Sequence, residues 1–174
     1  MKRLIGALLV AGLALFAAFS SARATTAATT TPRCKTGALE VWLGVGTGGA
    51  GAGSTVYPLE FTNESNQRCH LFGFPGVSAQ RAGHQVGSAA DRDHAVAART
   101  VTLAPRGTAH AQLRITNASV IAGCKPVTAE GLSVFPPGAV SAADVPFRFK
   151  ACSAVGKPFL SVQVVQPRVG VPGH

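Results

Sequence analysis

Histidines and carboxylates are the side chains of this sequence that could hold a metal ion or transfer protons. The five histidines are widely spaced, and only the segment Asp91-Arg92-Asp93-His94 brings two carboxylates and an imidazole close together. Oxygen and imidazole ligands of this kind suit several divalent metals. A solvated loop with a local Asp–Arg pair explains the same residues, and we favour that interpretation. We therefore expect no metal site and no cofactor.

Two further patterns have the spacing of a catalytic or cofactor motif without its context. The segment Gly44-Val45-Gly46-Thr47-Gly48-Gly49 fits the GxGxxG pattern, but a dinucleotide site needs these glycines to open a helix. The residues that follow, Ser54-Thr55-Val56-Tyr57, are typical of a strand. Lys35-Thr36-Gly37 resembles one element of a β-lactamase, whose serine and lysine partners are missing. We infer that both are structural segments.

The sequence therefore favours a binding or interaction module over an enzyme. The alternative is an exported hydrolase or metal-dependent enzyme with a dispersed site. It would require His84, His94 or His110 to converge with Asp91 or Asp93 in one cleft.

Partner contacts are expected in two loops, the Gly-rich segment 44–54 and the polar, Ala-rich segment 88–98. The residues that we select are Gly48 and Gly49 in the first segment, Arg92 and His94 in the second, and Arg99 directly after it. Trp42 and Tyr57 lie inside strand patterns, so we expect them to pack in the core or at an interface rather than to form a sugar platform.

The N-terminus has the three parts of a secretory signal peptide. Lys2 and Arg3 precede an apolar run over 4–19, and Ala22-Arg23-Ala24 offers small side chains at the cleavage site. The run is shorter than the roughly 20 residues that span a bilayer. No lipobox cysteine follows it. We expect cleavage after Ala24 and a secreted or extracytoplasmic protein without a transmembrane segment in the mature chain.

The mature chain divides into a leader, one domain and a tail. Residues 25–33 form a flexible Thr/Ala/Pro leader, 34–168 a single domain, and 169–174 a tail. Cleavage removes three of the sixteen basic residues and none of the seven acidic ones, which leaves a formal net charge of +6. The basic residues form no run. We expect a monomer whose extracellular or envelope partner can be anionic, and no nucleic-acid partner.

All four cysteines lie in the exported part, where an even count predicts two disulfides. Four cysteines allow three pairings, and the sequence alone does not choose between them. We favour Cys34–Cys69 and Cys124–Cys152, because each joins neighbouring segments. Zinc is a weaker explanation, since no two cysteines are two to four residues apart.

Short strands separated by Gly, Pro and Asn recur about every ten residues. Leu39, Val41 and Leu43 alternate with polar or exposed positions, and a hairpin is expected across Ala82-Gly83. The other expected strands are 55–62, 68–72, 100–103, 109–115, 131–135, 147–149 and 159–165, whereas 44–54 is expected to be loop. This pattern predicts an all-β fold, an immunoglobulin-like β-sandwich of about 7–9 short antiparallel strands with two disulfides.

Several phrases of the sequence occur together in one known family. They are Pro58-Leu59-Glu60-Phe61-Thr62-Asn63, Cys69-His70-Leu71-Phe72-Gly73-Phe74-Pro75-Gly76-Val77, Val101-Thr102-Leu103-Ala104-Pro105 and Gly131-Leu132-Ser133-Val134-Phe135-Pro136-Pro137-Gly138. The arrangement over residues 34–166 resembles the secreted actinobacterial domain-of-unknown-function family 4232. The resemblance implies an extracytoplasmic, sandwich-like domain, often lipid-anchored, without an established activity. It supplies no catalytic residue, and the missing lipobox departs from the anchored members.

Overall fold

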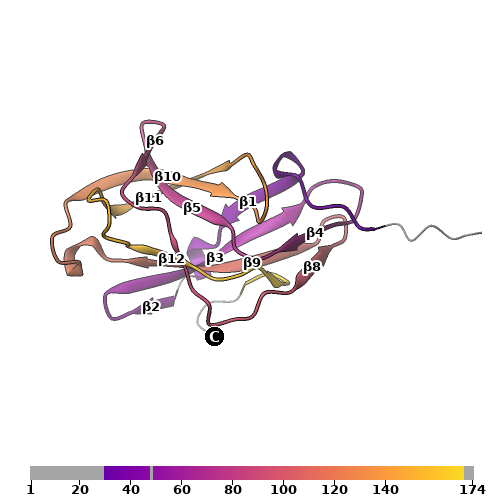
Figure 1. Cartoon of the computed structure of the whole chain (residues 1–174), viewed down its shortest axis with the longest axis horizontal. Helices are drawn as coiled ribbons and strands as arrows, with labels where there is room; N and C mark the ends of the chain where they lie inside the picture. The colour runs from indigo at the N-terminus through magenta and orange to yellow at the C-terminus, as the bar shows by residue number, and fades with distance from the viewer. Residues whose placement is uncertain (1–29, 48, 171–174) are drawn as a thin grey trace, which may run out of the picture.

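The computed structural model describes residues 30–47 and 49–170 (Figure 1). These residues form thirteen strands and three short 3₁₀ turns, and they contain no α-helix. The 3₁₀ turns are η1 (Thr36–Ala38), η2 (Val45–Thr47) and η3 (Ala118–Val120). No helix of the described part is long and apolar enough to cross a membrane. The expected signal peptide lies outside the described residues.

The largest sheet contains seven strands and runs in the order β1-β3-β9-β12-β7, with β2 pairing with β3 and β13 pairing with β9. Its strands are β1 (Leu39–Leu43), β2 (Gly49–Gly51), β3 (Ser54–Asn63), β7 (Asp91–Arg92), β9 (Thr108–Thr116), β12 (Leu160–Val162) and β13 (Gln166–Pro167). The two long strands, β3 and β9, are antiparallel over their full length and form its centre.

A four-stranded sheet of order β11-β10-β5-β6 faces the large sheet. Its strands are β5 (Gly76–Arg81), β6 (His84–Val86), β10 (Pro126–Phe135) and β11 (Ala143–Cys152). Figure 1 shows β5, β10 and β11 on one side and β3, β9 and β12 on the other. The remaining pair, β4 (Cys69–Phe72) and β8 (Thr100–Leu103), forms a small antiparallel sheet at one end.

The core lies between these sheets and follows from the period-two pattern of the strands. Leu59 and Phe61 on β3 point inward, as do Leu132 and Val134 on β10, and Leu71 on β4 joins the same cluster. All five side chains are buried. Because successive residues of a strand face opposite sides, the residues between them on β3 lie on the outer face of the large sheet.

Two disulfides fix segments that are distant in the sequence. Cys34 is bonded to Cys69, with Cα atoms 4.8 Å apart, and Cys124 is bonded to Cys152, with Cα atoms 5.3 Å apart. These are the pairs that the sequence analysis favours. They indicate an oxidising, extracytoplasmic compartment, because thiols are kept reduced in most cytosols.

The expected strands and the hairpin across Ala82-Gly83 are present, but the prediction that 44–54 is entirely loop is wrong. Gly49–Gly51 forms β2, which pairs with Val56, Thr55 and Ser54 of β3. A strand at a sheet edge needs only backbone hydrogen bonds, so it forms here from glycine and alanine despite their low strand propensity.

The expected strand number and orientation also need correction. The described residues form more strands than the expected 7–9, because several edge pairings involve only two or three residues. One pairing is parallel, between β7 and β12. β7 lies inside the 88–98 segment, where we expected a loop. A strand of two residues has no periodicity that the sequence could reveal.

Candidate functional site

The residues predicted to contact a partner do not form one surface. Gly49 lies in β2, whereas Arg92 lies in β7 at the other side of the large sheet. Strands β3, β9 and β12 separate them. At the usual strand spacing, these four steps correspond to about 19 Å. Gly48 lies outside the described residues.

Arg92 and His94 both contact Phe74, which precedes β5. The guanidinium carbon of Arg92 lies 5.6 Å from the centre of the Phe74 ring. The His94 imidazole packs against the same ring, with centroids 4.8 Å apart. The two side chains therefore form a local cation–π and aromatic cluster at the surface.

Asp93 has its own partners in this segment. Its Oδ2 accepts a hydrogen bond from Nε2 of Gln163 at 2.9 Å, and its Oδ1 accepts from the backbone N–H of Ala95 at 3.0 Å. These two hydrogen bonds, of which the one from Gln163 has the larger effect, hold the pKa of Asp93 below its ordinary value. Throughout the described ranges, no three His, Cys, Asp or Glu residues are grouped so that they could hold a metal ion.

The remaining predicted residue and the other histidines lie on different elements. Arg99 lines a shallow hollow together with Gln166–Arg168. His84 is the first residue of β6, and His110 lies on β9. The dispersed catalytic arrangement required one of His84, His94 or His110 to converge with Asp91 or Asp93 in a cleft. His94 follows Asp93 directly and packs on Phe74, whereas His84 and His110 lie on other strands.

A groove opens between the two large sheets, beside the β2–β3 hairpin. Its volume is about 360 Å³. Backbone and small side chains of the hairpin line one wall, and inward-facing residues of β3, β9 and β11 line the rest. The lining residues are Ala50, Gly51, Gly53, Ser54, Thr55, Tyr57, Ile115, Asn117, Phe147, Phe149 and Lys150.

An aromatic row forms the apolar side of this groove. The rings of Tyr57 and Phe147 meet edge to face, with centroids 5.2 Å apart. Phe147 stacks on Phe149 at 5.5 Å, and Phe149 leads to the buried Phe159 at 6.3 Å. Rings that support one another in this way keep their orientation, so the groove is preformed.

The polar side of the groove is supplied by short side chains. Thr55 and Tyr57 point inward from β3, next to Asn117, which begins the turn η3. The ammonium group of Lys150 donates to Oγ1 of Thr128 at 3.0 Å, so this cation is engaged on β10. An apolar wall with a few hydroxyl and amide groups is typical of a small-ligand site.

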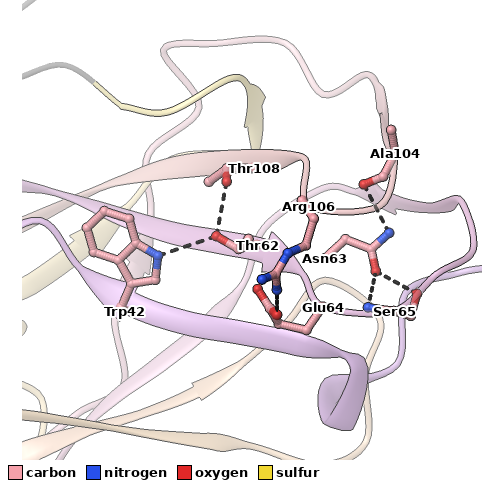
Figure 2. A network of polar contacts seen from close by, with 8 residues as sticks. All are labelled: Trp42, Thr62, Asn63, Glu64, Ser65, Ala104, Arg106 and Thr108. Atoms are coloured by element: carbon pink, nitrogen blue, oxygen red, sulfur yellow. Dashed lines mark hydrogen bonds and ion pairs between the residues drawn. The ribbon is translucent and has the colours of Figure 1, made fainter.

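A second polar feature crosses the outer face of the large sheet (Figure 2). Nε1 of Trp42 lies 3.4 Å from Oγ1 of Thr62, which shares a 3.0 Å hydrogen bond with Oγ1 of Thr108. Beside them, Glu64 forms an ion pair with Arg106. The contact with Thr62 holds the indole of Trp42 against the sheet, with 38% of the residue's surface exposed.

Asn63 joins two turns at the same end of the sheet. Its side-chain amide donates to the carbonyl oxygens of Gln67 at 2.8 Å and Ala104 at 3.2 Å. Its Oδ1 accepts from the backbone N–H of Ser65 at 3.1 Å and from the Ser65 hydroxyl at 2.7 Å (Figure 2). The Asn63 side chain therefore satisfies backbone groups of both turns.

Sequence reasoning missed the groove and the environment of Glu60. The groove depends on residues of β3 and β11 that are about 90 positions apart, and no local pattern indicates that they meet. The sequence carries no signal for the burial of Glu60. Between the apolar residues Leu59 and Phe61 of a strand, it is expected on the outer face of the sheet, and its burial depends on the distant residue Gly170.

The comparisons with known proteins give one match. The family model described as a domain of unknown function, DUF4232, matches residues 34–170. This match confirms the resemblance found in the sequence and covers nearly all of the described residues. No curated protein and no solved structure matches the chain.

Proposed function

The chain belongs to the DUF4232 family, and from this premise we propose that it is a non-enzymatic, exported binding module whose ligand enters the groove between the sheets. The aromatic row of Tyr57, Phe147 and Phe149 carries the proposal, because it is a preformed apolar wall next to accessible hydroxyl and amide groups. The ligand presents a flat apolar part and several hydrogen-bonding groups.

The chemistry of the lining residues supports binding over catalysis. The titratable side chains among them are the phenol of Tyr57 and the ammonium of Lys150. Acid–base catalysis near neutral pH usually relies on a histidine or a carboxylate within hydrogen-bonding distance of the substrate. Neither residue type is present in the lining.

Two disulfides support the exported location, together with the predicted signal peptide at 1–24. In the arrangement that we propose, the two facing sheets are an immunoglobulin-like sandwich and the groove is one open flank of it. The protein acts as a monomer whose partner is an extracellular or cell-envelope component. An anionic partner would be favoured by the net charge.

The proposal is tested by mapping ligand contacts on the mature chain. Small-molecule, glycan and peptide fractions of the cell envelope are added to isotope-labelled protein, and backbone amide shifts are followed by NMR. We expect shifts in Ser54–Tyr57 and Phe147–Phe149, whereas Thr100–Leu103 at the other end stay unchanged. A fraction that shifts only the cluster around Phe74 would replace the groove with the loop surface of Arg92 and His94.

Two conservative variants sharpen this test. Thr55→Val and Tyr57→Phe each remove a groove hydroxyl without changing the shape of the side chain much, and each should weaken binding roughly tenfold, the effect of about 1.4 kcal/mol. Thr102→Val is the matched control, because Thr102 is exposed on β8, away from the groove. Equal affinity of all three variants and the wild type would contradict the proposal.

A further inference from the structure

A glutamate without exposed surface lies on the outer face of the large sheet. Glu60 alternates with the core residues Leu59 and Phe61 on β3, so its side chain points away from the core. Its cross-strand neighbours are Trp42 on β1 and His110 on β9. An outer sheet face is normally open to water, so another segment must cover this carboxyl group.

The C-terminal segment provides the cover. After β13 the chain turns at Arg168, whose φ is 73°, and the carbonyl oxygen of Arg168 accepts a 2.9 Å hydrogen bond from Nδ1 of His110. Two residues later, the backbone N–H of Gly170 donates to Oε1 of Glu60 at 2.8 Å. The segment 166–170 therefore runs from the sheet edge onto the outer face.

Gly170 fits this position because it has no side chain. A Cβ atom at Gly170 would collide with Cβ of Pro58 and would lie 3.0 Å from the imidazole ring of His110. Contacts this close are almost never seen for a real Cβ atom, and here they involve a rigid proline and a ring that is already hydrogen-bonded. The close approach that buries Glu60 thus requires glycine.

Among the described residues, only one of the two carboxyl oxygens of Glu60 has a hydrogen-bond partner. Oε2 of Glu60 is buried and has no hydrogen-bond partner in the described part of the chain. Burial raises the pKa of Glu60 from 4.5 to about 7, and the hydrogen bond from Gly170 offsets a part of this effect. The charged or titratable side chains on the elements packed around it are Glu40 on β1, His110 and Arg114 on β9, and Arg168 on the segment itself.

We propose that Glu60 is a latch for the C-terminal segment 166–170: the segment is closed while the carboxyl group is protonated and is released when it ionises. A neutral acid tolerates a dry site with one unsatisfied oxygen, whereas a carboxylate requires water or further donors. The strands on either side of Glu60 are held in the sheet by long rows of backbone hydrogen bonds. The segment is held by the two residue pairs of β13 and two single hydrogen bonds, so it is the element that moves.

Release would change a surface separate from the groove. It would uncover Glu60 and its neighbour His110, and would extend the exposed face on which Trp42 and Thr62 already lie. The inference goes beyond the proposed ligand groove, because it assigns to the opposite side of the same sheet a state that depends on pH.

Hydrogen exchange of the mature chain tests the latch. Exchange of the C-terminal peptide is measured at pH 5.5 and 8.5, and both rates are corrected for the intrinsic effect of pH. If opening of the segment restores the ordinary pKa of Glu60, protection of the peptide should fall roughly 10-fold to 30-fold from the lower to the higher pH. Equal corrected protection at both pH values would overturn the proposal.

Three variants separate the latch from other causes. Glu60→Gln removes the ionisation, so the peptide should stay protected at both pH values, and Gly170→Ala should leave it exposed at both. Glu40→Gln is the matched control, because it removes an exposed carboxylate from the same sheet face and should keep the wild-type response. A response that persists in Glu60→Gln would show that another group controls the segment and would reject the latch.

Trp42 offers an independent readout, since it is the single tryptophan of the chain and lies opposite Glu60. Its fluorescence should change with a midpoint near pH 7 in the wild type and in Glu40→Gln. It should be constant over the same range in Glu60→Gln. Circular dichroism verifies that each variant keeps its sheet structure, and a pH-independent Trp42 signal in the wild type would count against the latch.

Discussion

The backbone N–H of Gly170 lies 2.8 Å from Oε1 of Glu60, and this hydrogen bond joins residues 110 positions apart in the sequence. Val169 and Gly170 fall in what the sequence analysis expected to be a tail beyond residue 168. The structure places Gly170 in a buried position against β3 and β9. The end of the family match at residue 170 coincides with this contact.

Glu60 should make the protein less stable as the pH rises, opposite to the usual effect of a paired carboxylate. Its pKa is raised on folding, so its contribution is complete below about 4.5 and is lost as the pH rises through about 7. We expect Glu60 to lower the free energy of unfolding by about 1–3 kcal/mol between pH 5 and pH 8. Urea unfolding of wild type and Glu60→Gln at both pH values measures this, and parallel pH profiles of the two proteins would refute it.

Asn63 should be one of the most sensitive polar positions. Asn63→Ala removes the hydrogen bonds from the buried Asn63 side chain to Gln67, Ala104 and Ser65, which tie two turns together, so it should destabilise the fold by about 2–3 kcal/mol. Asn66→Ala, at an exposed position of the same turn, should change stability by less than about 0.5 kcal/mol. Chemical denaturation of the two variants compares them directly. Equal losses would show that the turn, rather than the Asn63 network, determines the effect.

Gly87 should tolerate alanine much less than Gly83 does. Both have positive φ, 64° and 75° respectively. A Cβ at Gly87 would also collide with the carbonyl oxygen of Cys152, whereas nothing lies within 4 Å at Gly83. We expect a loss of about 1 kcal/mol for Gly83→Ala and clearly more, about 3 kcal/mol, for Gly87→Ala. Thermal unfolding of both variants measures the difference, and similar melting temperatures would contradict it.

Each disulfide should contribute substantially to stability. The bonded cysteines are 35 and 28 positions apart, and on the chain-entropy model loops of this length correspond to about 3–4 kcal/mol each. The double variants Cys34→Ala/Cys69→Ala and Cys124→Ala/Cys152→Ala should therefore unfold at lower urea concentration. Non-reducing peptide mapping of the wild type checks the pairing first. A Cys34–Cys124 linkage there would invalidate this estimate and the pairing together.

Much of the fold was predictable because its signals are local. The alternation of Leu39, Val41 and Leu43 marks β1, and Ala82-Gly83 supplies the positive φ values that the hairpin between β5 and β6 needs. Residues 49–51 gave no such signal. Glycine and alanine lack the side chains on which strand patterns depend, and β2 forms only because β3 offers an edge to pair with.

The all-β class, the turns, the even set of cysteines and the family can be inferred from the amino-acid order, since each is encoded in neighbouring residues or in their spacing. The meeting of Tyr57 with Phe147 in a groove, the distance between Arg92 and Gly49, and the cover that Gly170 places over Glu60 are properties of the assembled sheets. These relationships depend on which strands become neighbours. That choice is made by the packing of the whole core, and no short segment contains it.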